Sequence, residues 1–477
     1  MTAHRVTLSM ITITPYGAAG EVTGSAYLVE TESSTILVDF GMFQGDKDDD
    51  ARNVIPGRIH RMDIASVVLT HVHLDHCGRL PLQVREGYRG PIFCTEATRD
   101  LSEIIMADAA HIQESDFERR KRRAERKGHK VNRNDEPLYD ADDVEQCVSQ
   151  MVDVFYDQPV EVAPGITAVY HDAGHMLGSA SVELRIKDQG TEKIVVFSGD
   201  VGPPNLPYLR DPEPPLKADV LVMESTYGDR NHKSLSDTLE EFERIIIEAV
   251  EQKGKIFIPS FAIGRAQQIL FHLSDLIRKK RIPALPIYLD SPMAIKASAV
   301  YRKHEELFDT EATKITDDGT LYHNLRSLRT CVTADESKAI NDEHGPFIVI
   351  AGSGMVTAGR IMHHLNNNIN DPKSHFVISG YQGRGTLGRR LVDGADHIMI
   401  MGEYKEVRAK IHTLGGFSAH AGQVDLVKWY EAVARGGKPT LFLTHGEDDA
   451  RTVLRNTLIE LFDAPAYMPV YSEHLEV

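Results

Sequence analysis

Three histidines and one aspartate lie within six consecutive residues, His71 to His76, in the stretch THVHLDHCG. The stretch continues the apolar run IASVVLT, which predicts a buried strand that ends near His71. His71 and His73 are two residues apart, so their side chains project the same way if the strand geometry continues, and Asp75 and His76 follow as the chain turns. One short loop could therefore serve two metal ions.

The donor types of this loop favour zinc. Imidazole nitrogen and carboxylate oxygen suit zinc best among the common ions, with iron and manganese as open alternatives, whereas magnesium prefers oxygen alone. A catalytic pair of ions at about 3.5–4 Å needs further ligands from elsewhere in the chain, including a bridging carboxylate. The candidates are three residues at the ends or just beyond the ends of predicted strands, namely His175 in HDAGHMLGSAS, Asp200 in IVVFSGD and His445 in PTLFLTHGE.

The composition limits the classes of protein. A chain of 477 residues with 42% hydrophobic content can form two or three domains, each with its own core. No window approaches the roughly 18 uninterrupted apolar residues of a membrane span, and the start MTAHRVTLSMITITPYGAAG lacks the pattern of a signal peptide. The four cysteines form no CxxC pair, which fits a reducing compartment. We therefore expect a cytoplasmic protein with no membrane partner.

The net charge of −17 is the wrong sign for a protein that coats nucleic acid nonspecifically, so any such binding must be local. The strongest local bias is the basic stretch RRKRRAERKGHKVNR, Arg119 to Arg133, with nine Lys or Arg and one Glu. The acidic stretch NDEPLYDADDVE follows it. Two interpretations stay open: a solvated helical arm neutralised by the acidic stretch, or an arm that faces RNA.

Short apolar runs that end in a polar residue predict the strands of an α/β protein. Because ligands of open α/β sheets lie beyond the carboxyl ends of strands, the residues at five such ends are expected to share one rim. These residues are Asp39, His71, Asp200, Glu224 and His445. The middle of the chain instead alternates amphipathic helices, such as Leu235 to Gly254, with further apolar runs, which predicts a second doubly wound layer inserted into the first.

These motifs resemble those of the metallo-β-lactamase superfamily and, within it, of the β-CASP ribonucleases. HVHLDH resembles the second superfamily motif, and Asp39, His175 and Asp200 resemble the first, third and fourth. ESTYG around Glu224, GGFSAHAG around His420 and LTHGE around His445 resemble the three β-CASP motifs in their usual order.

The resemblance implies an α/β fold, a metallo-β-lactamase αββα sandwich with an inserted β-CASP domain. The expected segments are 1–228 for the first part of the sandwich, 229–405 for the insert and 406–477 for the C-terminal part of the sandwich. A histidine in the last motif implies the RNA-processing branch, of the stand-alone bacterial or archaeal type related to the mRNA 3′-end cleavage endonuclease.

The resemblance also implies a site for two Zn²⁺ ions. His71, His73 and His175 would hold one ion, Asp75, His76 and His445 the other, and Asp200 would bridge them. Asp39 would orient the HxHxDH ligands, and His420 would be the general acid. Gly422 stands where an acidic residue often follows FSAHA in this family, so Glu224 is expected to hold His420.

The implied function is a zinc-dependent ribonuclease for RNA processing or decay. A metal-bridging hydroxide would hydrolyse single-stranded RNA to 5′-phosphate and 3′-hydroxyl ends. Endonuclease and 5′-to-3′ exonuclease activity both stay open, as does a homodimer.

The insert offers candidate phosphate contacts in turns that follow predicted strands, where helix N-termini and glycine-rich loops attract anions. They are Ser260, Arg265, Ser353, Thr386 and Arg389.

Three other functions are considered. GYQGRGTLG contains a GxGxxG pattern typical of dinucleotide-binding proteins, but this pattern accounts for none of the histidines. A dinuclear zinc hydrolase of a small ester or thioester would not need so large an insert. A noncatalytic RNA-processing subunit would not need every ligand position filled.

Overall fold

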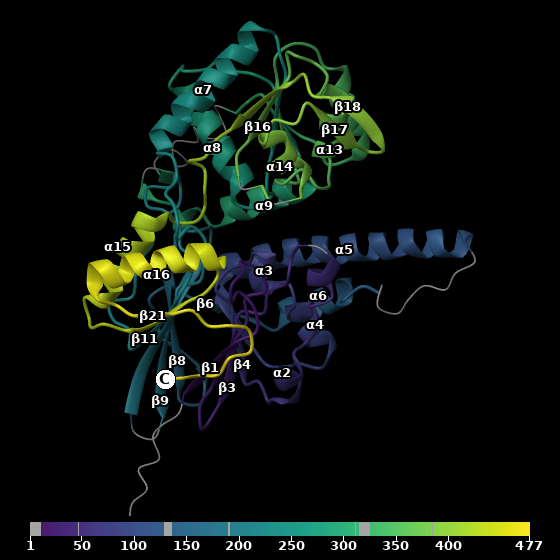
Figure 1. Cartoon of the computed structure of the whole chain (residues 1–477). Helices are drawn as coiled ribbons and strands as arrows, with labels where there is room; N and C mark the ends of the chain where they lie inside the picture. The colour runs from purple at the N-terminus through teal and green to yellow at the C-terminus, as the bar shows by residue number, and fades with distance from the viewer. Residues whose placement is uncertain are drawn as a thin grey trace, which may run out of the picture. The chain divides into compact units, whose positions relative to one another are not determined.

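The computed structural model describes residues 11–45, 47–127, 136–188, 191–310, 312–313, 325–380, 382–383 and 385–477. These residues form two compact units (Figure 1). Unit 1 runs to Pro204 and adds Asp211–Asn231 and His420–Val477, and unit 2 consists of Asn205–Arg210 and His232–Ala419. Unit 2 is thus an insertion between sequence segments of unit 1. The finer segment boundaries at 228/229 and 405/406 stay predictions.

Unit 1 contains two seven-stranded sheets. The first has the order β22-β1-β2-β3-β4-β5-β6. Its strands are β1 Thr12–Pro15, β2 Tyr27–Glu30, β3 Thr35–Val38, β4 Ser66–Val68, β5 Ile92–Thr95, β6 Met151–Val154 and β22 Leu475–Glu476. The second has the order β21-β20-β11-β10-β9-β8-β7. Its strands are β7 Val160–Ala163, β8 Ile166–Asp172, β9 Ala180–Asp188, β10 Thr191–Phe197, β11 Val220–Met223, β20 Thr440–Leu443 and β21 Ala466–Tyr467.

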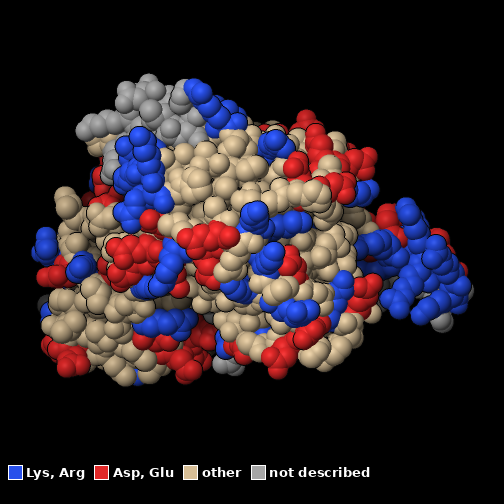
Figure 2. Space-filling model, turned by 90° about the horizontal axis from the view of Figure 1, so that it is seen from above, with Lys and Arg blue, Asp and Glu red and all other residues tan. Residues whose placement is uncertain are grey.

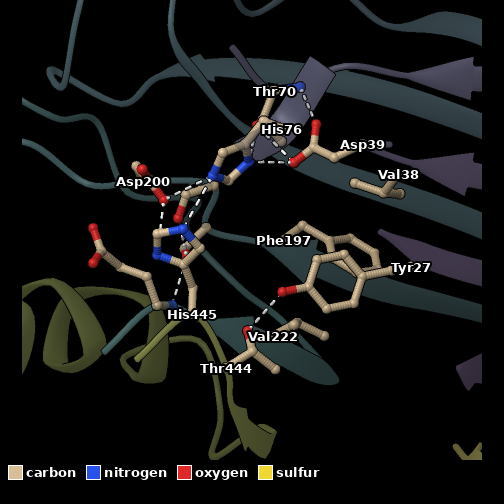
Figure 3. A pocket seen from close by; sticks show the side chains of 13 residues that line it. Tyr27, Val38, Asp39, Thr70, His76, Phe197, Asp200, Val222, Thr444 and His445 are labelled. Carbon is tan, nitrogen blue, oxygen red and sulfur yellow. Dashed lines mark hydrogen bonds and ion pairs between the residues drawn. The ribbon is translucent and has the colours of Figure 1, made fainter. Parts of the chain in front are cut away.

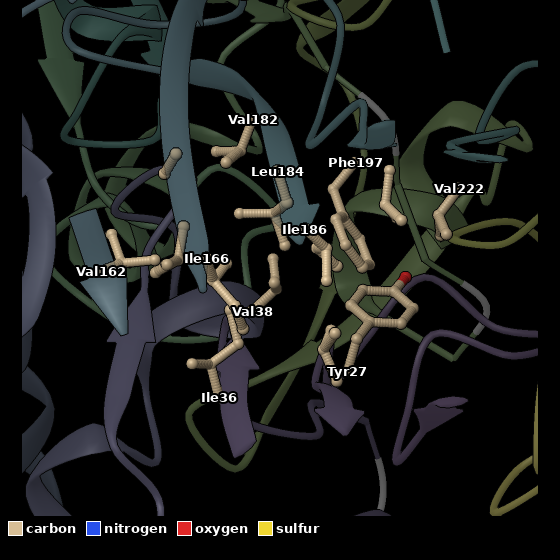
Figure 4. Packing of buried hydrophobic residues seen from close by; sticks show 14 of the residues in the cluster. Tyr27, Ile36, Val38, Val162, Ile166, Val182, Leu184, Ile186, Phe197 and Val222 are labelled. Atoms are coloured by element: carbon tan, nitrogen blue, oxygen red, sulfur yellow. The ribbon is translucent and has the colours of Figure 1, made fainter. Parts of the chain in front are cut away.

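The two sheets of unit 1 pack face to face around one apolar core. Figure 4 shows side chains of both sheets in this core, with Tyr27 and Val38 from the first sheet against Phe197 and Val222 from the second. The rings of Tyr27 and Phe197 lie 5.3 Å apart between centroids. Burial of these side chains away from water is the main force that holds the sheets together.

Helices cover the outer face of each sheet of unit 1. Those connected to the first sheet are α1 Lys47–Asp50, α2 Gly57–Arg61, α3 Leu74–Cys77, α4 Leu80–Arg85, α5 Glu96–Arg126 and α6 Ala141–Ser149. On the second sheet, α15 (Gln423–Ala434) and α16 (Asp448–Phe462) bury Trp429 and Leu454 against strands β10, β11 and β20. The order of layers is therefore helix, sheet, sheet, helix.

Unit 2 is a doubly wound α/β layer. Its six-stranded sheet has the order β14-β13-β15-β12-β16-β19, and every pair in it is parallel. The strands are β12 Ile256–Pro259, β13 Ile287–Asp290, β14 Leu328–Thr330, β15 Ile348–Ala351, β16 His375–Ile378 and β19 Lys410–Thr413, and a separate hairpin joins β17 His397–Ile400 to β18 Glu403–Glu406. The helices are α7 Leu235–Glu251, α8 Arg265–Arg278, α9 Pro292–Lys303, α12 Ala334–Ala339, α13 Ile361–Asn368 and α14 Leu387–Val392, with 3₁₀ turns η2 Glu305–Leu307 and η3 Ile340–Asp342.

Alternate residues of the unit 2 strands face opposite sides of the sheet. Ile256 and Ile258 pack with α7 and α8 in one apolar cluster, whereas Phe257 between them packs with α13 and α14 in another. Both faces are therefore buried, which explains why these strands read as uninterrupted apolar runs.

The helix expected over residues 235–254 is α7, which begins at Leu235 after the capping residue Ser234 and ends at Glu251. It ends early because Gln252 is its C-cap and Lys253 takes a left-handed φ of 53°. None of the helices in the described ranges is long and apolar enough to cross a membrane.

Candidate metal centre and active site

The carboxyl ends of the unit 1 strands bring the expected residues together at one rim. Asp39 directly follows β3, Glu224 follows β11, and Asp200 lies three residues beyond the end of β10. The loop that leads from β4 into α3 supplies His71 and His73. Strand β10 lies beside β11, and β11 lies beside β20, which ends two residues before His445.

Four residues form a first cluster of ligand atoms. Nε2 of His71 and Nε2 of His175 each lie 3.1 Å from Nδ1 of His73. Oδ2 of Asp200 lies 3.5 Å from Nε2 of His71 and 3.6 Å from Nε2 of His175. All four ligand atoms lie within 4.8 Å of one another, close enough to share one ion.

A second cluster lies at the other oxygen of Asp200, and Figure 3 shows two of its residues, His76 and His445, beside Asp200. Nε2 of His445 lies 3.2 Å from Nε2 of His76 and 3.4 Å from Oδ2 of Asp75. The remaining oxygen of Asp200, Oδ1, lies 3.3 Å from Nε2 of His76 and 3.3 Å from Nδ1 of His445. Asp200 thus presents one oxygen to each cluster, which is the placement of a bridging carboxylate.

The carboxylate of Asp200 tests whether these residues suit metal ions. The residue is 1% exposed, and neither of its oxygens has a hydrogen-bond partner among the described residues. A buried carboxylate without hydrogen bonds costs roughly several kcal/mol, and coordination of a cation compensates that cost. The donors around it are imidazole nitrogens and a second carboxylate, which are the ligands of zinc and related ions. The residues present fit a metal centre.

The charge states of His71 and Asp200 suit metal binding, whereas at His76 the charges of Asp200 and Asp39 outweigh burial and raise the pKa well above its ordinary value. Burial, together with the neighbouring imidazole of His76, holds the pKa of His71 well below its ordinary value, so that the His71 ring is neutral. Burial alone would raise the pKa of Asp200, but the imidazoles of His445 and His76 hold it well below its ordinary value. Neutral imidazole and ionised carboxylate are the forms that coordinate metals.

Asp39 orients His76, a residue of the second cluster, through a hydrogen bond. Its Oδ2 accepts a 2.8 Å hydrogen bond from Nδ1 of His76 and a 2.9 Å bond from the hydroxyl of Thr70, and its Oδ1 accepts a 2.8 Å bond from the Thr70 N–H. The bond to Nδ1 leaves Nε2 of His76 free of a proton when the ring is neutral. Asp39 takes a left-handed φ of 57°, an uncommon conformation for a residue with a side chain.

His420 lies beside Asp200 with a separate partner. Its Nδ1 is 3.4 Å from Oε1 of Glu224 and 3.8 Å from Oδ2 of Asp200. The backbone N–H groups of Val201 and Thr226 donate to the Glu224 carboxylate at 2.6 and 3.3 Å and fix it in place. Burial lowers the pKa of His420, but the charges of Glu224 and Asp200 outweigh burial and raise the pKa to about 9.

Gly422, which stands where an acidic residue often follows FSAHA in this family, is the N-cap of α15. Glu224 is therefore the carboxylate other than Asp200 that stands beside His420 in this structure.

The candidate phosphate contacts lie in unit 2, outside the metal centre. Ser260 and Ser353 come just after β12 and β15, which are adjacent parallel strands, so both lie at one edge of the sheet. The hydroxyl of Thr386 caps α14 by accepting from the Arg389 N–H at 3.2 Å. Arg265 begins α8 and donates to Gln268 at 2.6 Å. Phosphate binding by these residues stays a prediction.

Three residues near these sites were not expected from the sequence. The hydroxyl of Thr70 lies 3.1 Å from Nδ1 of His71, and that of Thr226 lies 3.1 Å from Nδ1 of His445. Both threonines lie in or beside sequence motifs, and this position is the feature of the sequence that could have identified them. In unit 2, Phe261 is 42% exposed beside Ser260.

Family models match three stretches of the chain. A metallo-beta-lactamase superfamily domain matches residues 28–198, a Beta-Casp domain matches 266–391, and a Zn-dependent metallo-hydrolase RNA specificity domain matches 404–469. The first and last matches fall on the two sides of the second, as the predicted inserted fold requires. The αββα sandwich with an inserted β-CASP domain is therefore confirmed.

Relatives match nearly the whole chain. Ribonuclease TTHA0252 of Thermus thermophilus is 38% identical over 446 residues, which cover 94% of this chain and 95% of that protein. Transcription termination factor FttA of Thermococcus kodakarensis is 32% identical over 459 residues, covering 92% and 67%. A solved structure of a protein of unknown function from Enterococcus faecalis shares the fold with a TM-score of 0.55 at 12% identity, covering 98% of this chain and 100% of that one. The chain thus belongs to the β-CASP ribonuclease family of the metallo-β-lactamase superfamily, and it is a metal-dependent hydrolase with a nuclease role.

Proposed function

We propose that this protein is a zinc-dependent ribonuclease that cuts single-stranded RNA and leaves 5′-phosphate and 3′-hydroxyl ends. The observation that carries the proposal is the position of Asp200. Its two buried oxygens accept no hydrogen bond among the described residues and face two separate clusters of ligand atoms, and His420 stands at the same carboxylate. This arrangement suits hydrolysis of a phosphodiester, in which negative charge must be neutralised and a leaving oxygen must receive a proton.

Two zinc ions would be held by the residues of the two clusters, with Asp200 shared. The ligands are His71, His73 and His175 for one ion and Asp75, His76 and His445 for the other. When bound, such ions supply an acidified water near neutral pH and neutralise charge on the phosphate oxygens. Asp39 would keep His76 in the orientation that this site needs, through its 2.8 Å hydrogen bond.

His420 is proposed as the general acid that protonates the departing 3′-oxygen. Its side chain is 22% exposed, whereas that of Asp200 is 1% exposed, so an atom of a bound substrate can reach the imidazole. Glu224 stabilises the protonated ring through its charge, and a pKa of about 9 keeps the ring protonated at neutral pH. The product ends follow because water attacks phosphorus and the 3′-oxygen leaves with the proton.

The choice of RNA rests on family membership. The domain model that matches residues 404–469 is described as an RNA specificity domain, and the relative from Thermus thermophilus is named a ribonuclease. In unit 2, the half-buried Ser353 offers a polar group for a strand, and the exposed ring of Phe261 offers a surface on which a base can stack, whereas Ser260 is 2% exposed and its hydroxyl donates to the Phe261 carbonyl at 2.9 Å.

The test is a cleavage assay on matched single-stranded RNA and DNA of one sequence, each labelled at either end. The holoenzyme, a chelated sample and a chelated sample reconstituted with zinc are compared on a denaturing gel. We expect cleavage of RNA by the holoenzyme and the zinc-reconstituted sample, with little cleavage of DNA. The ends should be substrates for a ligase that requires 5′-phosphate and 3′-hydroxyl groups.

Two results would contradict the proposal. Products with a cyclic 2′,3′-phosphate would show that the RNA 2′-hydroxyl is the nucleophile, which leaves no role for water. A zinc-loaded sample that cleaves neither polymer but hydrolyses a small ester or thioester would instead identify the alternative hydrolase.

A further inference from the structure

Helix α5 of unit 1 extends well beyond the core that supports its first half. It begins at Glu96 behind the capping residue Thr95, and its last buried residue is Ala110, although the helix continues to Arg126. The remaining 16 residues span about 24 Å at 1.5 Å per residue. Residues 111–126 therefore form a helical arm without a core of its own, and we call this segment the arm.

The end of the arm carries a row of arginines along one side of the helix. Arg119, Arg122, Arg123 and Arg126 follow the spacing i, i+3, i+4, i+7 and so share one face of the helix. All four are exposed. Figure 2 shows that Lys and Arg side chains gather over this projecting end of α5. We call these four residues the arginine face.

Three acidic side chains border the arginine face but are outnumbered by the basic ones. Glu118 lies four residues before Arg122 and Glu125 lies three residues after it, so both are neighbours of Arg122 on the helix surface, and Lys121 lies 3.7 Å from Glu118. Asp116 pairs with Arg119, at the base of the arginine face. Over residues 116–127 the charges are seven positive and three negative, which gives a net charge of +4 in a chain of net charge −17.

The acidic stretch that follows the arm in sequence has other partners in the structure. Asp140 and Asp143 form the capping box of α6, and Asp143 also lies 3.7 Å from Arg85 of α4. The N–H of Leu138 donates to Gln113, at the base of the arm, at 2.9 Å. From Gln113 to the arginine face the helix rises about 9 to 20 Å. Within the described residues, this stretch is therefore anchored near the base of the arm; residues 128–135 lie outside the described part.

The arginine face is suited to bind an anionic polymer that carries phosphate groups. Arginine binds phosphate through a planar fork of N–H donors, and a row of arginines suits a chain of phosphates. A lipid surface would also require an apolar face along the helix, but the two large apolar residues of the arm, Ile112 and Phe117, precede the arginine face, and Ala124 is the only apolar residue between Glu118 and Lys127. Long polar helices without a core are marginally stable alone, so a surface of this kind is best explained by a partner.

Helix α5, which carries the arm at its far end, starts next to the metal centre of the same unit. The hydroxyls of Thr95 and Thr98, at the N-terminus of α5, donate to the carbonyl of Gly178 at 2.8 and 2.9 Å. Gly178 is three residues from His175, a ligand of the first cluster. The arm therefore leads away from the site where the phosphodiester is cut.

We propose that the arginine face binds the phosphate backbone of the RNA substrate at a distance from the metal centre. The proposal rests on the proposed ribonuclease function. It adds a second contact point, which only a strand long enough to reach from the metal centre to the end of α5 can use. The helix spans about 46 Å over its 31 residues, so short oligonucleotides cannot occupy both places.

The test compares long and short RNA with a variant that keeps the helix. Arg122→Gln, Arg123→Gln and Arg126→Gln are combined, because glutamine keeps helix propensity and removes charge. The matched control is Lys217→Gln, Lys428→Gln and Lys438→Gln, three exposed lysines of unit 1 outside the arm. kcat/KM is measured with the holoenzyme on RNA of about five and about forty nucleotides over a range of salt.

For the long RNA, we expect the arm variant to lower kcat/KM about tenfold at low salt and to reduce the salt slope by about 2, because each lost phosphate contact removes about 0.7. Cleavage of the short RNA should be unchanged in the arm variant, and the control should behave like the unaltered protein on both. An unchanged value and salt slope on long RNA would overturn the proposal and point to an acidic protein partner instead.

A failure of the proposed ribonuclease function would be visible separately. If the holoenzyme cleaves neither RNA, binding of the intact forty-nucleotide strand is measured by fluorescence anisotropy with the same variants. Loss of affinity and salt slope in the arm variant alone would still support the arginine face as an RNA contact, and equal affinity in all three proteins would refute it.

Discussion

Two histidines at the rim of unit 1 have different surroundings and should have different roles. His73 faces two other imidazoles at 3.1 Å, whereas His420 faces the carboxylate of Glu224 at 3.4 Å. A ring among other imidazoles suits coordination, because protonation there would place like charges together. A ring beside a carboxylate is stabilised in its protonated form, which suits proton donation.

Replacement of His420 should therefore separate catalysis from metal binding. We expect His420→Ala to lower kcat about 10²- to 10⁴-fold on RNA while the metal content of the protein is retained. Glu224→Gln, which keeps the shape of the side chain, should lower kcat in the same direction and shift the alkaline limb of the pH–rate profile to lower pH. Loss of metal in His420→Ala would contradict the assignment and place His420 among the ligands.

A buried histidine in unit 2 should make that unit sensitive to acid. His272 of α8 stacks on Phe417 with ring centroids 5.0 Å apart, and its buried Nε2 has no hydrogen-bond partner in the described part of the chain. Burial lowers its pKa to about 3 from an ordinary value of 6.5. The unfolded chain binds this proton below pH 6.5 and the folded chain does not, so stability is lost as the pH falls from about 6.5 toward 3, by up to about 1.4 kcal/mol per pH unit.

The variant His272→Phe tests this sensitivity. We expect the free energy of unfolding of unit 2 to fall less between pH 7 and pH 5 in His272→Phe than in the unaltered protein, as measured by denaturant titration. His363→Phe, on the exposed side of α13, is the matched control and should keep the original pH dependence. Equal slopes in all three proteins would show that His272 does not titrate on unfolding.

At the scale of elements, one glycine allows two loops of the metal centre to meet. A Cβ atom on Gly41 would lie 1.6 Å from the backbone oxygen of Asp75, in the loop that carries the second cluster. Any side chain at this position must push the loop away. Gly41→Ala should therefore lower metal occupancy and activity although it removes no ligand.

The matched control for Gly41→Ala is Gly57→Ala. A Cβ on Gly57, the first residue of α2, meets only the end of the Arg61 side chain, at 3.3 Å. Metal content measured by elemental analysis should fall in the first variant and stay unchanged in the second. Full metal occupancy in Gly41→Ala would show that the loop adjusts without loss of the site.

Strand ends were the part of the fold that the sequence could predict well. Asp39 and Glu224 directly follow buried strands, and a run of apolar residues that stops at a carboxylate marks such an end. The start of α7 at Leu235 was also predictable, because Ser234 is a capping residue before an amphipathic pattern.

Other features depend on tertiary contacts and could not be predicted. The hydroxyl of Thr226 meets His445 across 219 positions of sequence, and no local pattern encodes that distance. The sequence also did not predict the partners of the acidic stretch after the arm. Asp143 belongs to the capping box of α6 and lies near Arg85 of α4, a contact that depends on how the two helices pack. The assignment of the seven metal ligands came from the family resemblance, and their roles in coordination stay predictions.

At the scale of the whole molecule, all seven expected metal ligands belong to unit 1. Ions that bind the folded unit but not the unfolded chain stabilise that unit alone. We expect chelation to lower the unfolding temperature of unit 1 and to leave that of unit 2 unchanged in scanning calorimetry. His272→Phe, a change in unit 2, identifies which transition belongs to which unit. A chelator that shifts neither transition, or only that of unit 2, would contradict this assignment.

The most direct test of the proposed dinuclear centre is the number of ions bound per chain, measured together with RNA cleavage in the same sample. We predict two zinc ions per chain in active protein. We also predict that His73→Ala loses metal and activity together, whereas His60→Ala, an exposed histidine of α2, keeps both. Active protein that holds no transition metal, or a His73→Ala variant that keeps full metal content and activity, would contradict the account.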